Sequence, residues 1–407
     1  MTTPGPLIIS TMKNEGPYIL EWIAYHRAIG FADFLIYTND CEDGTDTLLD
    51  RLTERGIVQH ERNKVLRRGP HKSALKAARV HPVTVAAEWM LISDVDEFLN
   101  IHIGDGSVQA LIDAQPDNTD AIPITWKLFS HDGQVAFEDR PLIAQFTDAQ
   151  RPLDQGGMPD RFVKTLFRGQ DRVERFGLHR PIVAQEHVET YISRAPDGTV
   201  FDGDMRNAKS RTHFAYDAAQ MNHYAVRSLD SYLIKRDRGR ANHVGQVLGA
   251  DYWQKMCLGG ERDLSIQRHL PAVEDEIAAL RDDPQTARLH DDAVAWHHAK
   301  IAELRARPEF SALHDQISRL IAAGDHLRTR DMAPMSLELE QAADAPAAPA
   351  SFAAAGNADP ADTLRDMAAQ MRKLLDFVGP AEAASAAHAR LDEIERGLFG
   401  KTSRSQD

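Results

Sequence analysis

Short apolar runs punctuate the first hundred residues of the chain. Continuous apolar segments occur at residues 7–11, 34–37 and 90–93, and residues 57–60 form a weaker run of the same kind. Runs of this length, without alternation of polar residues, are typical of strands buried on both faces. The pattern therefore predicts four strands of a parallel sheet, each connected to the next by another kind of element.

Helical periodicity fills the intervals between these runs. Residues 17–30 carry apolar side chains three and four apart, begin with proline and end with glycine, and residues 45–56 have the same spacing, with Asp43 or Thr45 as the cap and Gly56 as the end. A third helical stretch, residues 71–88, is interrupted at Pro82. Strands that alternate with helices predict an α/β fold whose parallel sheet is covered on both faces.

The rest of the chain divides by composition and pattern. The part that follows carries mixed signals, which predict an α+β half that completes the first domain. We expect strands at 121–129 and 161–167, a turn at 196–200 and a helix with a basic end at 227–242. We expect the following parts: a catalytic domain at residues 1–245, a helical extension at 246–330, a disordered Ala/Pro-rich linker at 331–362, and C-terminal helices at 363–400 that could serve self-association.

Composition narrows the class of protein. The 407 residues carry 61 acidic and 47 basic side chains, and the net charge of -14 argues against a nucleic-acid binder. Two distant cysteines, Cys41 and Cys257, predict neither a disulfide framework nor a zinc site. No leader and no run of 18 apolar residues occurs, so we expect a cytoplasmic protein without a transmembrane segment, peripheral to the inner membrane if it contacts it.

Polar side chains follow three of the predicted strands. Because the carboxyl ends of parallel strands meet at one edge of a sheet, these clusters should line a common crevice. The clusters are Lys13, Asn14 and Glu15, then Asn39, Asp40 and Asp43, and finally Asp94, Asp96 and Glu97.

The third cluster lies in the segment "WMLISDVDEFL". Asp94 and Asp96 are two residues apart, so on an extended backbone their side chains would leave the same face and could share Mg²⁺ or Mn²⁺. A surface turn after a strand is the alternative interpretation, and the spacing alone does not decide between them. The three clusters together favour the metal.

At this point the order of motifs resembles glycosyltransferase family 2 and the related family 92. The resemblance rests on "KNEGPYILEWIAYHRAIG" (13–30), "IYTNDCEDGT" (36–45), "WMLISDVDEFL" (89–99) and "NHYAVRSLDSYLIKRDRGR" (222–240). It implies a GT-A, Rossmann-like fold with a mixed sheet, a nucleotide-sugar donor, a divalent cation held by Asp94 and Asp96, and transfer with inversion. Assembly of a surface polysaccharide or lipopolysaccharide, with a saccharide or a lipid-linked acceptor, is implied in the same way.

The resemblance also distributes roles among the polar residues. His223 would complete the metal site, with His179 as the alternative ligand. Lys235 and Arg238 would neutralise the diphosphate, and Lys13 could reach a phosphate. The base and ribose of the donor, first of all a UDP-sugar, would meet Asn14, Glu15, Asn39, Asp40 and Asp43, for which turn and cap chemistry is the alternative.

Inverting transfer needs a general base for the acceptor hydroxyl. The preferred candidate is Asp160, which precedes a predicted strand, over the pair Glu138 and Asp139, while Glu97 is expected to orient the metal ligands.

Three alternative functions remain open: a haloacid dehalogenase-type phosphotransferase, a non-catalytic sugar-binding scaffold, and a nucleotidyltransferase, although the last lacks a Gly-rich phosphate loop.

Overall fold

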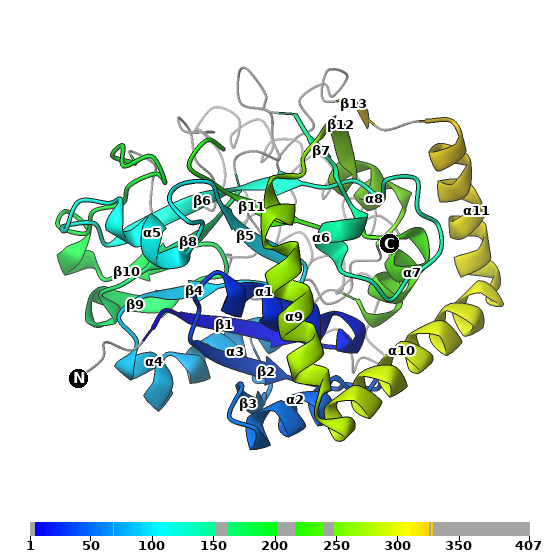
Figure 1. Cartoon of the computed structure of the whole chain (residues 1–407), viewed down its shortest axis with the longest axis horizontal. Coiled ribbons are helices and arrows are strands. Elements are labelled where there is room, and N and C mark those ends of the chain that lie inside the picture. Colours follow the sequence, from blue (N-terminus) through cyan, green and yellow to red (C-terminus); the bar gives the residue numbers. More distant parts are fainter. Residues whose placement is uncertain are drawn as a thin grey trace, which may run out of the picture. The chain divides into compact units, whose positions relative to one another are not determined.

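A mixed sheet of eight strands runs through the protein (Figure 1). The computed structural model describes residues 5–67, 69–151, 162–201, 216–239, 248–324 and 327–328. The strands of this sheet, in chain order, are β1 (Leu7–Met12), β2 (Asp33–Thr38), β3 (Gln59–Arg62), β4 (Met90–Ile92), β5 (Glu97–Ile101), β6 (Ala121–Leu128), β8 (Val163–Phe167) and β11 (Ala219–His223).

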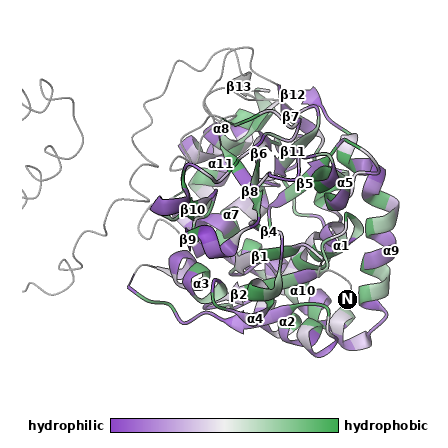
Figure 2. Ribbon diagram, turned by 90° about the vertical axis from the view of Figure 1, so that its left-hand side faces the viewer, coloured by the Kyte–Doolittle hydropathy of each residue, from purple (hydrophilic) through white to green (hydrophobic). Residues whose placement is uncertain are grey.

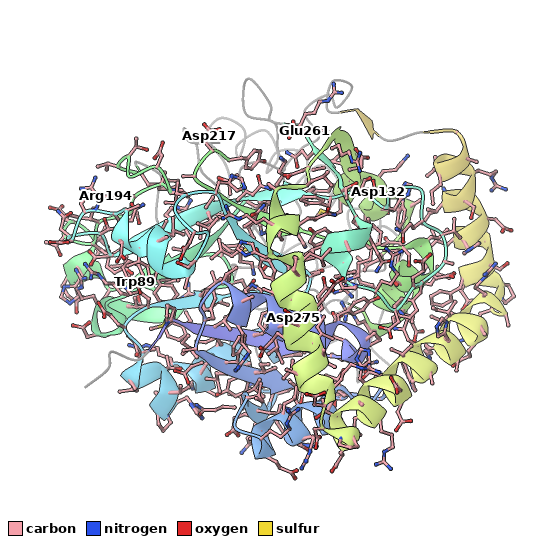
Figure 3. All side chains as sticks on the ribbon, viewed as in Figure 1. Trp89, Asp132, Arg194, Asp217, Glu261 and Asp275 are labelled. Carbon is pink, nitrogen blue, oxygen red and sulfur yellow. The ribbon has the colours of Figure 1, made fainter. Side chains whose placement is uncertain are left out.

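Strand direction decides which loops share an edge of the sheet. The spatial order is β3-β2-β1-β4-β8-β6-β11-β5, and β3, β2, β1 and β4 are mutually parallel. Strand β8 runs antiparallel to both β4 and β6, so β6 and its parallel neighbour β11 point the same way as β4. The loops after β1, β2, β4 and β11 therefore open at one edge, while Trp89, before β4, marks the opposite edge (Figure 3).

Helices cover both faces of the sheet and continue beyond it. They are η1 (Gly16–Tyr18, a 3-10 turn), α1 (Ile19–Ala28), α2 (Thr45–Glu54), α3 (Pro70–Ala78), α4 (Pro82–Ala86), α5 (Val108–Asp113), α6 (Leu142–Gln145), α7 (Leu229–Arg238), α8 (Ala250–Met256), α9 (Leu270–Arg281), α10 (Pro284–Arg305) and α11 (Pro308–Ala322). Two small sheets pair β9 (Val173–Phe176) with β10 (Pro181–Val183), and β12 (Leu258–Arg262) with β7 (Asp148–Gln150) and β13 (Leu327–Arg328).

Alternate residues of β1 belong to two different hydrophobic cores. Ile8 packs with Trp22 of α1 on one face, whereas Leu7 and Ile9 pack with Leu75 of α3 on the other. This alternation explains why β1 reads as an unbroken apolar run, because neither face is exposed to water. Figure 2 shows hydrophobic segments in the central strands and alternating hydrophilic and hydrophobic segments along the peripheral helix α9.

Helix α10 packs against η1, α2 and α7, which belong to the amino-terminal and central parts of the chain. At Gly16 the two segments lie so close that an added Cβ atom would be 2.5 Å from the Cβ of Ala293. The helical extension is therefore built onto the loop that follows β1. Within the described ranges, every helix is too short or too polar to span a bilayer.

The predicted α/β fold, with a mixed sheet and a helical region after it, is confirmed. The predicted strand at residues 57–60 lies at Gln59–Arg62, and the interrupted helix is present as α3 and α4, separated just before Pro82. Strands β5 and β11 were not predicted, and β12 lies inside the expected helical extension. Asp160, the linker at 331–362 and the helices at 363–400 lie outside the described residues.

Candidate active site

A short turn between β4 and β5 carries Asp94 and Asp96 at the shared edge of the sheet. Glu97, the first residue of β5, folds back under this turn, and its Oε2 accepts hydrogen bonds from the Asp94 backbone N–H (2.9 Å) and Ser93 Oγ (3.1 Å). Glu97 is fully buried. The carboxylate of Glu97 therefore shapes the turn that presents the two aspartates.

Two lysines pair with the aspartates. Lys164 on β8 places its Nζ 3.0 Å from Asp94 Oδ2 and 3.1 Å from Glu97 Oε2, and its side chain is 1% exposed. Lys235 on α7 places its Nζ 2.9 Å from Asp96 Oδ2 and donates to the Ala225 carbonyl at 2.6 Å. Each aspartate thus has one oxygen engaged by an ammonium group.

The surrounding charges set the protonation of this cluster. Burial alone would raise the pKa of Asp94, but Lys164 and His71 together hold it below the usual value. Burial opposes ionisation of Asp96 as well, yet Lys235 and His223 lower its pKa well below the usual value. Both aspartates are therefore carboxylates at neutral pH. Burial instead raises the pKa of Glu97, although Lys164 counteracts this effect.

Imidazoles face the second oxygen of each aspartate. His223, the last residue of β11, has its Nε2 3.7 Å from Asp96 Oδ1, and His71 on α3 has its Nε2 4.0 Å from Asp94 Oδ1. The His223 Nδ1 is buried without a hydrogen-bond partner among the described residues. The alternative ligand His179 donates a hydrogen bond from its Nδ1 to the Val163 carbonyl (3.0 Å) and packs its ring against Trp126.

Asp96 and His223 fit a divalent cation. Two ligand atoms at about 2.1 Å from one Mg²⁺ ion lie no more than about 4.2 Å apart, and Oδ1 of Asp96 and Nε2 of His223 meet this limit. Within the part of the chain that the structure describes, no group of three His, Cys, Asp or Glu side chains is gathered as a metal site. Asp94 is the third residue that was predicted to bind the metal. Its carboxylate lies closer to Lys164 than to His71.

The loop after β1 is bound to the region around α7 by ion pairs. Glu15 pairs with Arg227 Nη1 at 2.8 Å and with Arg238, and its side chain is 5% exposed. Arg238 also donates to the Lys13 carbonyl at 2.9 Å, and the Arg227 guanidinium lies 3.6 Å from the centre of the Tyr18 ring. Glu15 and Arg238, both predicted to bind the donor, thus bind each other in this structure.

Asn14 and Asp43 join the loops after β1 and β2. Asn14, at φ +52°, accepts a hydrogen bond from the Glu42 backbone N–H at its Oδ1 (2.8 Å). Asp43 accepts from the N–H groups of Gly16 at Oδ2 (2.8 Å) and of Thr45 at Oδ1 (2.9 Å). These contacts are the turn and cap chemistry that the sequence left as the alternative for these residues.

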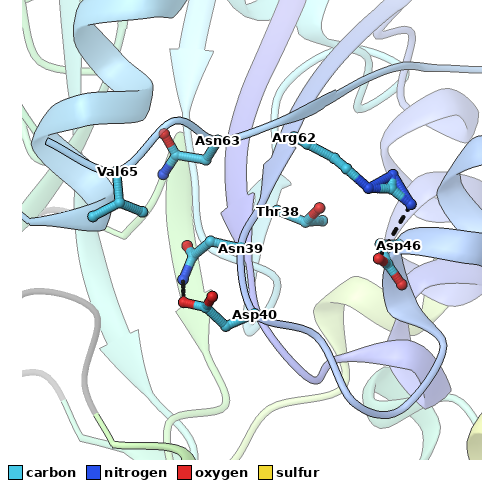
Figure 4. A pocket seen from close by; sticks show the side chains of 7 residues that line it. All are labelled: Thr38, Asn39, Asp40, Asp46, Arg62, Asn63 and Val65. Atoms are coloured by element: carbon cyan, nitrogen blue, oxygen red, sulfur yellow. Dashed lines mark hydrogen bonds and ion pairs between the residues drawn. The ribbon is translucent and has the colours of Figure 1, made fainter.

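A pocket of about 330 Å³ opens beyond the ends of β2 and β3 (Figure 4). Asn39 and Asp40 lie on one side of it, where Asn39 Nδ2 donates to Asp40 Oδ2 at 3.0 Å. Most of the lining side chains are polar. Two of the charged ones, Arg62 and Asp46, form an ion pair at 3.2 Å. The pocket is lined by Thr38, Asn39, Asp40, Asp46, Arg62, Asn63 and Val65.

The predicted site residues separate into groups. The structure brings Asp94, Asp96, His223 and Lys235 together, and it places Asn39 and Asp40 at the pocket. The sequence analysis did not identify Lys164, His71 and Arg227 as site residues. Lys164 carried the clearest signal, because it is the one charge inside the apolar strand "FVKTLF" and a buried charge requires a partner.

Comparison with known proteins points in one direction. Glycosyltransferase family 92 matches residues 9–230, which is more than half of the chain. A family 92 protein of Ricinus communis is 32% identical over 107 residues, or 25% of this chain and 18% of the relative. One of Oryza sativa subsp. japonica is 29% identical over 97 residues, covering 23% and 16%. The chain thus aligns with less than a fifth of the length of these relatives.

The solved structures that the chain resembles include TarS from S. aureus and HddC from Yersinia pseudotuberculosis, all at low identity. S. aureus TarS 1-349 is 12% identical with a TM-score of 0.30, covering 78% of this chain and 91% of that chain, and its complex with UDP is 16% identical with a TM-score of 0.26, covering 40% and 46%. HddC from Yersinia pseudotuberculosis is 9% identical with a TM-score of 0.27, covering 47% and 89%. At TM-scores of this size, the family match carries the assignment.

Proposed function

The chain belongs to glycosyltransferase family 92, and from this membership and the arrangement around Asp96 we propose that it transfers a glycosyl group from a nucleotide-sugar donor to an acceptor hydroxyl. One observation carries the proposal: two ionised aspartates, a histidine and a lysine meet at the sheet edge where ligands of α/β folds bind. A polar pocket of about 330 Å³ lies at the same edge.

A divalent cation, Mn²⁺ or Mg²⁺, is part of the proposal. Asp96 and His223 would hold it, with Asp94 beside them, because carboxylate oxygens and a neutral imidazole suit these ions. When bound, the cation would act as a Lewis acid on the negative charge that develops as the nucleoside diphosphate departs.

The chain's own cations would also contact the donor. The Lys235 ammonium lies between Asp96 and the Ala225 carbonyl, and its side chain is 17% exposed, so it is available to a phosphate oxygen. Arg227 and Arg238 are engaged by Glu15, and their role would be to hold the loop after β1 in place. We assign the nucleoside to the pocket lined by Asn39 and Asp40, and a UDP-sugar is the first donor to test.

Inversion requires a base on the acceptor side of the sugar. Asp160 remains the predicted base, and the acceptor remains a saccharide or a lipid-linked glycan by expectation from the family resemblance. Self-association through the helices at 363–400 is likewise a proposal.

The dehalogenase alternative is disfavoured because Asp94 follows β4, which lies next to β1 in the sheet, and does not follow the first strand of the chain.

The proposal is tested by incubating the purified protein with UDP-, GDP- and dTDP-sugars, with and without Mn²⁺, and measuring release of the nucleoside diphosphate. We expect metal-dependent turnover that falls at least a hundredfold in Asp96→Asn and persists in Asp113→Asn, an exposed aspartate on α5. Turnover of phosphate monoesters instead would favour the phosphotransferase. Sugar binding without turnover of any donor would favour the scaffold.

A further inference from the structure

We infer that the cation and the donor diphosphate enter this site together, because Lys235 already neutralises the carboxylate that the cation needs. This inference rests on the proposed function and concerns the order and cooperativity of binding. It depends on the different positions of the two lysines beside the aspartates.

Lys164 is balanced by two carboxylates and stays in place. Its Nζ lies 3.0 Å from Asp94 and 3.1 Å from Glu97, and the side chain is 1% exposed. The ammonium therefore cannot move to solvent without leaving two buried carboxylates, Asp94 in part and Glu97 entirely, without their cation. Lys164 is a fixed part of the site whether or not other ions are bound.

Lys235 competes with the incoming cation. Its Nζ lies 2.9 Å from Asp96 Oδ2, while the second oxygen, Oδ1, faces His223 Nε2 at 3.7 Å, where the cation would bind. The Ala225 carbonyl, 2.6 Å from the same Nζ, keeps the ammonium near Asp96. A divalent cation bound alone would therefore share one carboxylate with an ammonium group, and two positive centres a few ångströms apart repel each other strongly.

A diphosphate removes this conflict. Its oxygens bring negative charge to the place where the cation and the Lys235 ammonium meet, so each positive centre gains a partner. By linkage, the nucleotide must then raise the affinity for the cation by the same factor by which the cation raises the affinity for the nucleotide. The site should discriminate against the free metal ion and accept the metal complex of the nucleotide.

The test measures Mn²⁺ binding to the full chain with and without UDP, GDP or dTDP, by the electron paramagnetic resonance signal of free Mn²⁺ after subtraction of the Mn²⁺ that each nucleotide binds without protein. For the wild type we expect the preferred nucleotide to tighten Mn²⁺ binding at least tenfold. Lys235→Met should bind Mn²⁺ alone at least fivefold more tightly than the wild type and lose most of the nucleotide effect. Lys300 on α10 forms a comparable pair with Asp237 on α7 at 3.1 Å, so Lys300→Met removes an equal charge and should behave as the wild type does.

The outcomes separate this inference from the function it rests on. Mn²⁺ bound by the wild type equally tightly with and without nucleotide would overturn the inference and leave the transferase intact. A Lys235→Met variant that binds Mn²⁺ alone more weakly than the wild type would overturn it too. Should this variant fail to fold, the comparison of wild type with and without nucleotide decides alone. Absence of both Mn²⁺ and nucleotide binding would overturn the proposed function itself.

Discussion

Lys164 reaches Asp94 from the neighbouring antiparallel strand, and its Nζ lies 3.0 Å from Asp94 Oδ2 in a position that is 1% exposed. The same ammonium lies 3.1 Å from Glu97, so one buried cation holds two carboxylates that would otherwise repel each other. Strand β8 was predicted for its apolar residues, but its single lysine is what connects it to the active site.

Removal of this ammonium should cost stability. We expect Lys164→Met to lower the free energy of unfolding by roughly 3 kcal/mol, because breaking a buried ion pair leaves a charge without its partner. Urea denaturation at pH 7 measures the loss, and Lys76→Met, at an exposed position of α3, serves as the control. The double variant Lys164→Met/Glu97→Gln should regain part of the loss. A single variant as stable as the wild type would contradict this role.

Glu21 should make stability fall as the pH rises. Burial raises its pKa from 4.5 to about 7, while the Ile143 backbone N–H donates to its Oε1 at 3.1 Å. A carboxyl group with a raised pKa in the folded state stabilises fully below its unfolded pKa, and this contribution is lost as the pH rises through its folded pKa. The difference corresponds to roughly 3 kcal/mol between pH 4.5 and 7.

Glu21→Gln isolates this contribution, because the amide oxygen can still accept from Ile143. Its unfolding free energy, minus that of the wild type, should grow between pH 4.5 and 7 in denaturation curves. Glu174→Gln, exposed on β9, should keep the wild-type dependence. Parallel curves for Glu21→Gln and the wild type would show that Glu21 titrates normally.

Gly16 and Ala293 should be coupled in stability. A Cβ on Gly16 would lie 2.5 Å from the Ala293 Cβ, so Gly16→Ala forces α10 away from the loop after β1. We expect a loss of about 1–3 kcal/mol, as for other overpacked sites. Ala293→Gly removes the opposing methyl group, so the double variant should be more stable than the sum of the single effects predicts. Strict additivity in thermal or urea unfolding would argue against this contact.

Val65 offers a test of the nucleoside pocket. This residue lines the pocket and is 45% exposed, so Val65→Trp should fill part of the volume of about 330 Å³ without disturbing the core. We expect the KM for the donor to rise at least fivefold, with a smaller change in kcat. Val80→Trp, at a 73% exposed position after α3, is the matched control. An unchanged KM in Val65→Trp would place the nucleoside elsewhere.

The sequence could predict the parallel half of the sheet because β1, β2 and β4 are apolar on both faces. Strands β5 and β11 escaped prediction for a physical reason: β11 reads "AQMNH", whose polar residues face a buried polar network, in which Gln220 donates to Asp263 at 2.7 Å. Only Ala219 and Met221 of these five residues are apolar, so the alternation is too short to identify a strand from the sequence. The pairing of β11 with β5 joins segments more than a hundred residues apart, which the local sequence does not indicate.

The same limit applies to the site. The proximity of Asp94 and Asp96 could be predicted from their spacing after a strand, since two residues on one loop are constrained locally. The contribution of Lys164, more than sixty residues away, depends on which strand lies beside β4, and the sequence order does not reveal this. Glu15 and Asp43 were predicted as donor ligands because acidic loops look alike in the sequence, although Glu15 binds an arginine here and Asp43 accepts from backbone N–H groups.

The packing of Ala293 over Gly16 has a consequence for how the protein is synthesised. A loop at the start of the chain is buttressed by a helix that is synthesised nearly three hundred residues later. During translation, the first strands can pair long before α10 leaves the ribosome, but the loop after β1 still lacks this helix beside it. We therefore expect nascent chains that stop before α10 to remain inactive, so that catalytic competence appears only late in synthesis.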